Sequence, residues 1–275
     1  MPRAGSPAVA NHRGTQPPDP TQQRQGGSTV SNTRTPQPFM YEDFQQALDT
    51  LSEALVQAPV YALLLGDSGS GKTTLLRTLA AGLDRRRFHV LYLCHGQPSP
   101  SGLARVLAEA LHLPLRRTRA ETSRLLVQTL RNLPTRLLFF IDEAQLIRDD
   151  TLHEIRLLAE ADLEGPPLFS VVLSALPELK DQLLAPQLFP LWRRIRPKLT
   201  ITGLRRGELE GFLDHSIAKG TANRFEAQAL DAIFEQGRGT PALLVAFVES
   251  CLKAHPQGTI SAEQVAVVLD RIEAT

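Results

Sequence analysis

Apolar residues along the chain follow two different periods. Short continuous apolar runs alternate with stretches in which apolar residues recur every three to four positions. The first pattern is typical of strands buried on both faces, and the second of amphipathic helices. The runs that predict strands are residues 60–65, 88–94, 137–141, 168–173 and 198–201. Strands that alternate with helices in this order indicate an α/β domain with a parallel sheet.

The two ends of the chain depart from this alternation. Residues 1–38 are rich in Pro, Gln, Gly, Ser, Thr and Arg, and have too little apolar surface to offset the entropy lost on ordering. From Arg205 onward the pattern is purely helical, and Ser261 with Gln264 predicts a capping box before the last helix. We therefore divide the chain into a disordered arm (1–38), an α/β domain (39–203) and a small all-α lid domain (204–275).

The Gly-rich turn after the first predicted strand carries the most specific signal. Residues 66–73 read G-x4-G-K-T, the spacing of a phosphate-binding loop, and lie between a strand and a helix as that motif requires. Glycines let backbone N–H groups face phosphate oxygens, and the helix that begins near Gly71 adds its positive end. Lys72 would hold the β- and γ-phosphates of ATP, and the Thr73 hydroxyl suits Mg2+. The predicted nucleotide-binding residues are Gly66, Asp67, Ser68, Gly69, Ser70, Gly71, Lys72, Thr73 and Thr74. An ordinary Gly/Ser turn is the alternative.

Two carboxylates follow the third predicted strand. Asp142 and Glu143 come directly after the apolar run 137–141. Because ligands of open parallel sheets lie beyond the carboxyl ends of the strands, we expect these carboxylates and the phosphate loop to share one crevice. Asp142 can hold Mg2+, and Glu143 can polarise a water that attacks the γ-phosphate. The alternative is an acidic start of a surface helix, since carboxylates are favoured there.

Composition changes this picture little. The formal charge of +1 over 275 residues names no partner. Cys94 and Cys251 are far apart, with no C-x-x-C or His cluster, which predicts reduced, buried thiols in a cytoplasmic protein. No apolar run approaches the roughly 20 residues that span a bilayer, and the N-terminus lacks the apolar segment of a secretory signal. We therefore expect no membrane partner.

Taken together, the motifs resemble AAA+ ATPases of the ExeA type, which are similar to the transposition ATPases Mu B, IstB, TniB and TnsC. The resemblance rests on residues 66–73, on Ile141-Asp142-Glu143-Ala144-Gln145, and on the stretch 173–179 with its Pro-Glu-Leu turn. It runs from about Phe39 to Ile272. It implies a P-loop αβα sandwich with a five-stranded parallel sheet, a helical lid, and ATP with Mg2+ between the two. It also implies assembly into rings or filaments on DNA.

The same resemblance implies that an arginine of one subunit reaches the γ-phosphate of its neighbour. Arg194, next to Arg193, matches that position, and a guanidinium there would stabilise transferred charge. An ordinary surface salt bridge is an equal alternative for Arg194. The predicted catalytic residues are thus Lys72, Asp142, Glu143 and Arg194, and the predicted metal ligands are Thr73 and Asp142.

Two positions depart from the pattern of these relatives. Leu176 replaces a polar sensor before the Pro-Glu-Leu turn, with Ser174 as the nearest polar substitute. Ala242 replaces the arginine of a Gly-x-Pro-Arg segment, and Arg238 is close but out of register. Because groups aimed at transition-state charge supply much of the rate, we expect slow hydrolysis in which ATP mainly controls assembly.

Two arginine clusters are candidates for contacts with double-stranded DNA. They are Arg85, Arg86 and Arg87, and Arg116, Arg117 and Arg119. Solvated turns are the simpler interpretation of either cluster alone, although repetition in an oligomer would add weak contacts together.

The leading hypothesis is a cytoplasmic AAA+ ATPase that assembles on DNA and regulates transposition with a transposase partner. One alternative is a secretion- or pilus-associated ATPase of the ExeA kind, which we disfavour because the sequence ends after the lid without a membrane span. The others are a nucleotide-gated scaffold with little turnover and a small-molecule P-loop kinase.

Overall fold

The computed structural model describes residues 37–93, 98–161 and 165–273. From Pro38 onward the described chain forms one compact unit. Nearly all of the arm predicted at 1–38, and Cys94, lie outside the described residues.

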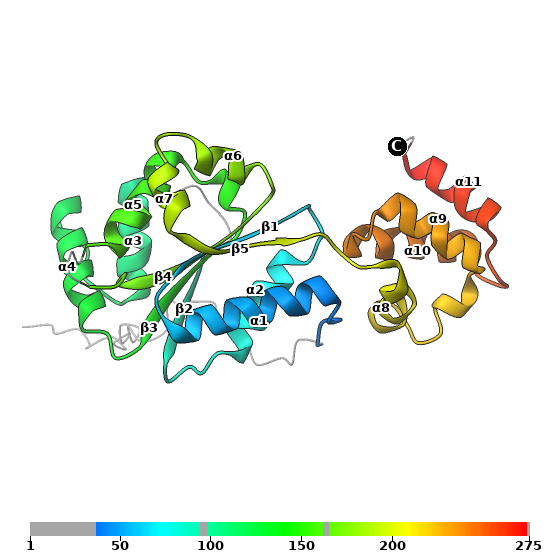
Figure 1. The fold of residues 1–275 in the computed structure, drawn as a ribbon, viewed down its shortest axis with the longest axis horizontal. Helices are drawn as coiled ribbons and strands as arrows, with labels where there is room; N and C mark the ends of the chain where they lie inside the picture. Colours follow the sequence, from blue (N-terminus) through cyan, green and yellow to red (C-terminus); the bar gives the residue numbers. More distant parts are fainter. Residues whose placement is uncertain (1–36, 94–97, 162–164, 274–275) are drawn as a thin grey trace, which may run out of the picture. The chain divides into compact units, whose positions relative to one another are not determined.

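A sheet of five parallel strands forms the centre of the first part of the chain (Figure 1). The strands are β1 (Tyr61–Gly66), β2 (Phe88–Leu93), β3 (Arg136–Ile141), β4 (Phe169–Ala175) and β5 (Ile195–Ile201). Their order is β2-β3-β4-β1-β5, and every neighbouring pair is parallel. The predicted five-stranded parallel sheet is therefore confirmed.

The last strand begins earlier than its apolar pattern indicated. We expected it at Lys198, whereas β5 starts at Ile195. β5 is an edge strand, and its exposed positions carry Arg196 and Lys198 instead of an apolar run. Charged residues and proline are common on edge strands because they discourage pairing with other chains, so the local pattern hid the start of β5.

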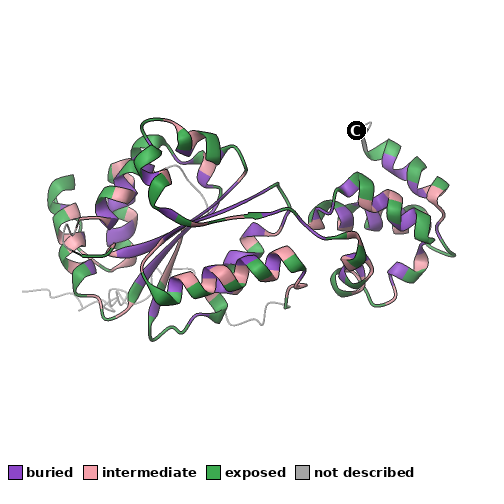
Figure 2. Cartoon of the chain, in the orientation of Figure 1, coloured by how far each residue is buried: buried purple, intermediate pink, exposed green. Residues whose placement is uncertain are grey.

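Helices cover both faces of the sheet. One face packs against α1 (Glu42–Gln57) and α2 (Lys72–Gly82). The other face packs against α3 (Pro100–Ala110), α4 (Arg119–Arg131), α5 (Asp149–Ala159), α6 (Leu179–Leu184) and α7 (Phe189–Arg194). Alternate strand residues serve the two layers: Leu64 joins the core with α1 and α2, and Leu63 joins the other. Figure 2 accordingly shows the central strands buried. The result is an αβα sandwich.

The helix α3 begins with a proline at its first position. The helix begins at Pro100, and Ser99 is its N-cap, with the Ser99 Oγ accepting a hydrogen bond from the Gly102 N–H at 3.2 Å. Proline is favoured at the first helical position because its φ angle is already helical. An N–H group at this position would have no acceptor within the helix, so its absence in proline costs nothing. Ser99 and Pro100 together therefore define the start of α3.

The rest of the chain is helical, as predicted. It contains α8 (Leu209–Ser216), α9 (Ala227–Gly237), α10 (Pro241–Ala254) and α11 (Ala262–Glu273). The capping box before α11 is confirmed: the Ser261 N–H donates to Gln264 Oε1 at 3.0 Å, and the Gln264 N–H donates to Ser261 Oγ at 3.5 Å. Cys251 is fully buried in α10, and this burial raises the pKa of its thiol to about 11. The prediction of a buried thiol holds for Cys251.

Two glycines allow the chain to pass from β5 into the C-terminal helices. The Leu204 N–H donates to the Gly239 carbonyl at 2.8 Å. A Cβ atom on Gly203 would lie 2.4 Å from that carbonyl oxygen, and one on Gly239 would lie 2.4 Å from the Leu204 oxygen. Both glycines have positive φ angles, +117° and +74°. A side chain at either position would push the backbone at Gly203 and Leu204 away from the backbone at Gly239. Residues near both, such as Leu204 and Leu244, belong to one apolar core.

None of the helices in the described part of the chain is both long and apolar enough to span a bilayer.

Candidate nucleotide-binding site

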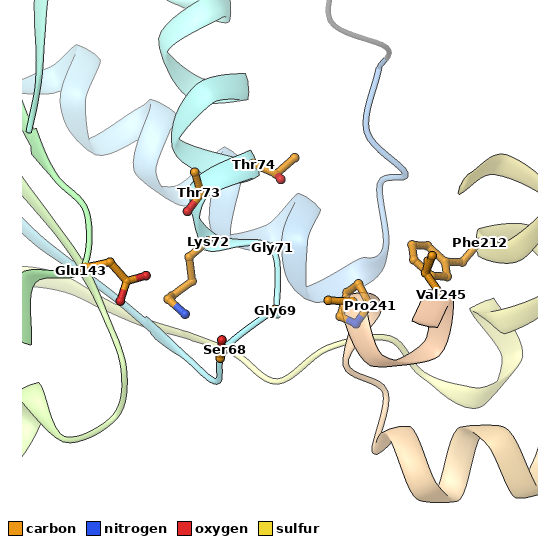
Figure 3. A pocket seen from close by; sticks show the side chains of 11 residues that line it. Ser68, Gly69, Gly71, Lys72, Thr73, Thr74, Glu143, Phe212, Pro241 and Val245 are labelled. Carbon is orange, nitrogen blue, oxygen red and sulfur yellow. The ribbon is translucent and has the colours of Figure 1, made fainter. Parts of the chain in front are cut away.

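The Gly-rich turn lies between the end of β1 and the start of α2 (Figure 3). The first hydrogen bond of α2 runs from the Leu75 N–H to the Gly71 carbonyl at 2.9 Å. The N–H groups before Leu75 are those that a helix leaves without an intrahelical acceptor. The first turn of α2 holds no acidic side chain. This helix end therefore offers backbone donors and a positive dipole to an anion.

The Lys72 side chain is held by the loop itself. Its Nζ donates to the carbonyls of Gly66 at 2.8 Å and Asp67 at 2.9 Å. The residue is 5% exposed, and this desolvation lowers the pKa of the amine, opposed by the nearby carboxylates of Glu143 and Asp142. An ammonium has three donors, so two bonds to neutral carbonyls leave a third for a phosphate oxygen.

Asp142 joins the phosphate loop to the centre of the sheet. Its carboxylate accepts hydrogen bonds from the hydroxyls of Thr73 (2.6 Å), Ser174 (2.8 Å) and Tyr92 (3.0 Å), and from the Glu143 N–H (3.1 Å). Asp142 is 8% exposed, and buried carboxylates need such partners. The two sequence motifs therefore meet at the carboxyl ends of β1 and β3.

Glu143 follows Asp142 in an unusual backbone conformation. Its φ and ψ angles are 53° and 41°, in the left-handed region that residues with a side chain rarely adopt. Its carboxylate lines the same pocket as Lys72, and Figure 3 shows the two side chains beside each other. Gln145, in the short 3-10 helix η1 (Ala144–Leu146), donates from Nε2 to Glu143 Oε2 at 2.7 Å.

The pocket at this site has a volume of about 540 Å³ and two kinds of wall. The phosphate loop, the start of α2 and Glu143 form the polar wall. The apolar wall comes from the C-terminal helices: Phe212, Pro241, Ala242 and Val245. The Ala242 N–H donates to the Gly69 carbonyl at 3.3 Å. A Cβ atom on Gly69 would lie 2.7 Å from the Ala242 Cβ, so glycine is needed for α10 to approach the loop.

Tyr92, Tyr41 and Phe212 were not predicted as neighbours of the site, whereas Ser174 was named as the nearest polar substitute for the sensor. Tyr92 and Ser174 reach Asp142 from β2 and β4. The sequence signal that could have indicated Tyr92 and Ser174 is a polar side chain near the carboxyl end of an apolar strand. The Tyr41 hydroxyl donates to the Ser70 carbonyl, and burial raises the pKa of Tyr41. Nothing in the sequence connected Tyr41 or Phe212 with the phosphate loop.

Arg194 lies at the other end of the sheet. Along β1 and β5, Tyr61 is paired with Ile195 and Gly66 with Ile201, so Arg194 precedes the amino end of β5 while the phosphate loop follows the carboxyl end of β1. The Arg194 Nε forms an ion pair with the Glu160 carboxylate at 2.5 Å, and 47% of its side chain is exposed. The structure therefore does not bring Arg194 to the phosphate loop of its own chain.

The two candidate arginine clusters lie on exposed segments. Arg85, Arg86 and Arg87 are in the turn before β2. Arg116 and Arg117 lie between α3 and α4, and Arg119, the first residue of α4, is paired with Glu154. Because its charge is already paired, Arg119 should contribute less than Arg116 and Arg117 to binding a phosphate backbone.

Comparisons with known proteins support the fold at this site. Residues 59–183 match a family model described as an AAA domain. Over 215 residues the chain is 26% identical to the general secretion pathway protein A of Aeromonas hydrophila, a match covering 75% of this chain and 39% of that protein. The chain thus spans about two fifths of the length of this curated relative. This match agrees with the resemblance to the ExeA type.

Solved structures extend the likeness to the C-terminal helices. The ORC2 protein of Aeropyrum pernix, in ADPNP–ADP complexes, matches with a TM-score of 0.62 at 15% identity, over 88% of this chain and 70% of that chain. The ORC1 protein of the same organism, in complex with DNA, matches with a TM-score of 0.58 at 16% identity, over 86% and 67%. The fold is therefore the P-loop AAA+ fold: a five-stranded parallel sheet between helices, followed by a helical C-terminal part.

Proposed function

We propose that the protein binds ATP with Mg2+ in the phosphate-loop pocket and hydrolyses it. The observation that carries the proposal is the 2.6 Å hydrogen bond from the Thr73 hydroxyl to the Asp142 carboxylate. It joins the phosphate loop to the strand that ends in two carboxylates. A hydroxyl and a carboxylate side by side are hard oxygen ligands of the kind that Mg2+ prefers.

The donors around the pocket fit a nucleoside triphosphate. The start of α2 and the third N–H of Lys72 suit the β- and γ-phosphates. Thr73 and Asp142 would hold Mg2+, which neutralises phosphate charge when bound. Phe212 and Val245 supply an apolar surface suited to a nucleobase. Glu143 faces the same space and is the candidate to polarise the attacking water.

We further propose that turnover is slow and that the helices at 204–275 act as a lid over the domain at 39–203. The support is Ala242, which lies against Gly69 where a cation would be expected from the resemblance. Arg238, the C-cap of α9, is absent from the pocket lining. With fewer cations directed at the γ-phosphate, less transition-state charge is stabilised.

Turnover and binding measured separately test the ATPase proposal. Steady-state hydrolysis with Mg2+ is expected below about 10 per second, a typical enzyme median. Glu143→Gln should stop turnover and keep ATP affinity within about twofold, because it removes a base and leaves the phosphate donors intact. Purified protein without affinity for ATP in the presence of Mg2+ would refute the proposal.

Assembly on double-stranded DNA is the finer part of the proposal, with a transposase as the partner in the cytoplasm. Arg194 supports an oligomer, because its place at the amino end of β5 would let it serve only a neighbouring subunit. The exposed Arg85, Arg86, Arg116 and Arg117 supply charges for a phosphate backbone. A role in secretion is the second candidate, favoured by the likeness to the general secretion pathway protein A.

Electron microscopy of the purified protein with duplex DNA, with and without a non-hydrolysable ATP analogue, separates these candidates. Nucleotide-dependent rings or filaments on DNA would support the first. The double variant Arg116→Glu, Arg117→Glu should abolish DNA binding, and wild-type binding should fall steeply with salt. The double variant Lys219→Glu, Lys253→Glu, at two exposed positions among the C-terminal helices, is the matched control for charge. ATP-dependent assembly that ignores DNA would favour the secretion role.

A further inference from the structure

Gln145 stands between the Glu143 carboxylate and the end of β4. Its Nε2 donates to Glu143 Oε2 at 2.7 Å, and its Oε1 accepts from the Leu176 N–H at 3.2 Å. Chemistry fixes this orientation of the amide, because the main-chain N–H can only donate and an ionised carboxylate can only accept. The Gln145 side chain thus connects the second residue after β3 with the first residue after the neighbouring strand β4.

The Glu143 carboxylate needs such support for two reasons. The residue is exposed, so its side chain would otherwise sample several rotamers. Its backbone is in the left-handed region, which persists only where the surroundings hold it. The hydrogen bond from Gln145 restrains the carboxylate while it lines the pocket beside Lys72.

The end of β4 offers few other ways to act on Glu143. Leu176 has an apolar side chain, and the Ser174 hydroxyl is directed to Asp142 at 2.8 Å. The main-chain N–H of Leu176 is therefore the polar group that reaches toward Glu143, and it does so through Gln145.

We propose that Gln145 is a positioning residue, which holds the Glu143 carboxylate toward the phosphate-loop pocket and ties its orientation to the end of β4. This inference rests on the ATP hydrolysis proposed above. Gln145 is not itself among the residues that line the pocket, and it reaches the pocket through its hydrogen bond to Glu143. Its effect should therefore appear in turnover and not in nucleotide affinity.

Substitutions at position 145 separate the two halves of the amide. Gln145→Glu keeps the length and the acceptor for Leu176, but loses the donor and adds a negative charge beside Glu143. Gln145→Ala removes both halves. Partners that orient a metal ligand typically contribute roughly 10- to 100-fold to activity, and we expect an effect of the same order for the partner that orients the Glu143 carboxylate. We expect both variants to lower kcat by at least about tenfold and to keep the ATP dissociation constant within about twofold.

Gln182→Ala is the matched control. Gln182, in α6, also uses its amide to bridge two segments, donating to the Ile147 carbonyl at 3.1 Å and to the Asp149 carboxylate at 2.7 Å. It has no hydrogen bond to Glu143 among the described residues. Its loss should leave kcat unchanged and shift the melting temperature by an amount similar to that of Gln145→Ala.

The measurements are kcat, the ATP dissociation constant and the melting temperature of the full chain and of each variant. Wild-type hydrolysis with unchanged kcat in both Gln145 variants would overturn the inference and leave the ATPase proposal standing. Parallel losses of kcat, affinity and melting temperature would also overturn it, since they indicate a structural role. Absence of hydrolysis in the wild type would overturn both.

Discussion

The two ends of the parallel sheet carry opposite kinds of polar site. At the carboxyl ends of the strands, Lys72 bonds to backbone carbonyls and the first turn of α2 keeps free donors. At the amino ends, a second pocket of about 460 Å³ is lined by Tyr61, Glu160 and Arg194 among others. There, the Glu160 carboxylate is paired with Arg156 at 3.0 Å and Arg194 at 2.5 Å. The first site offers donors to an anion, whereas the second already contains a carboxylate, Glu160, that pairs with two of its arginines.

Helix direction explains this difference. In a parallel sheet with crossover helices, helix N-termini gather at the carboxyl ends of the strands and helix C-termini at the amino ends. Positive dipole ends, as at α2, favour a bound anion. At the amino ends of the strands, α5 ends at Ala159. Arginines are favourable there because a helix C-terminus carries partial negative charge. Burial and the Glu160 carboxylate raise the pKa of Tyr61, which therefore stays protonated as a further donor to Glu160.

The largest difference between the two ends is expected when a lysine is removed from each and ATP affinity is measured. Lys72→Ala takes away the charge that the phosphate loop surrounds, and ATP affinity should fall by roughly 100-fold or more, since hydrogen bonds to charged groups contribute about 1.5–3 kcal/mol each. Lys198→Ala is the matched control, because Lys198 bonds to the Ile195 carbonyl at 2.8 Å and lies over the Trp192 ring at the opposite edge. Calorimetric titration with ATP and Mg2+ should detect loss of binding in the first variant alone.

Removing the acid at the amino ends should affect stability instead. Glu160→Ala leaves Arg156 and Arg194 without their shared partner, and Arg156 is only 15% exposed in its side chain. We expect the free energy of unfolding to fall by about 2 kcal/mol, measured by urea denaturation, with ATP affinity unchanged. Glu143→Gln at the carboxyl ends should leave the free energy of unfolding unchanged and stop ATP turnover. Equal effects of the two substitutions on stability would contradict the division between the two ends.

A single hydroxyl tests the finer geometry of the carboxyl-end site. Tyr92→Phe removes one of the hydrogen bonds that orient the Asp142 carboxylate. Loss of such a partner to a metal ligand typically costs 10–100-fold in metal affinity or activity, so half-maximal activation should need about tenfold more Mg2+. Tyr61→Phe is the control at the amino ends, where the hydroxyl contacts Glu160 at 3.4 Å. Mg2+ titrations of ATP hydrolysis compare the two variants directly.

The sequence predicted those features that depend on neighbouring residues. The spacing of residues 66–73 and the run 137–141 are local patterns, and the structure has a strand–turn–helix and a central strand at these places. The capping box at Ser261 and Gln264 is local as well. The start of β5 was missed because an edge strand needs no continuous apolar run.

The sequence could not predict which side chains contact the site residues, because these contacts depend on strand register and on packing between segments. Tyr92 meets Asp142 because Tyr92 pairs with Phe140 across β2 and β3, and Ser174 follows Leu173, which pairs with Ile141. Gln145 finds Leu176 through the same β3–β4 neighbourhood. Phe212, in α8, lines the pocket together with phosphate-loop residues that are far from it in the sequence. No spacing within one segment encodes these contacts between segments.

Arg194 gives the smallest expected effect in an isolated subunit and the sharpest test of the role of the amino ends. Because nearly half of its side chain is exposed, Arg194→Ala should lower the free energy of unfolding by less than about 1 kcal/mol and leave ATP affinity unchanged. If Arg194 serves a neighbour, turnover per subunit in the wild type should rise with protein concentration and this rise should vanish in the variant. Arg196→Ala, in the same pocket lining, is the control. A concentration dependence that survives in Arg194→Ala would assign Arg194 to the ion pair with Glu160 alone.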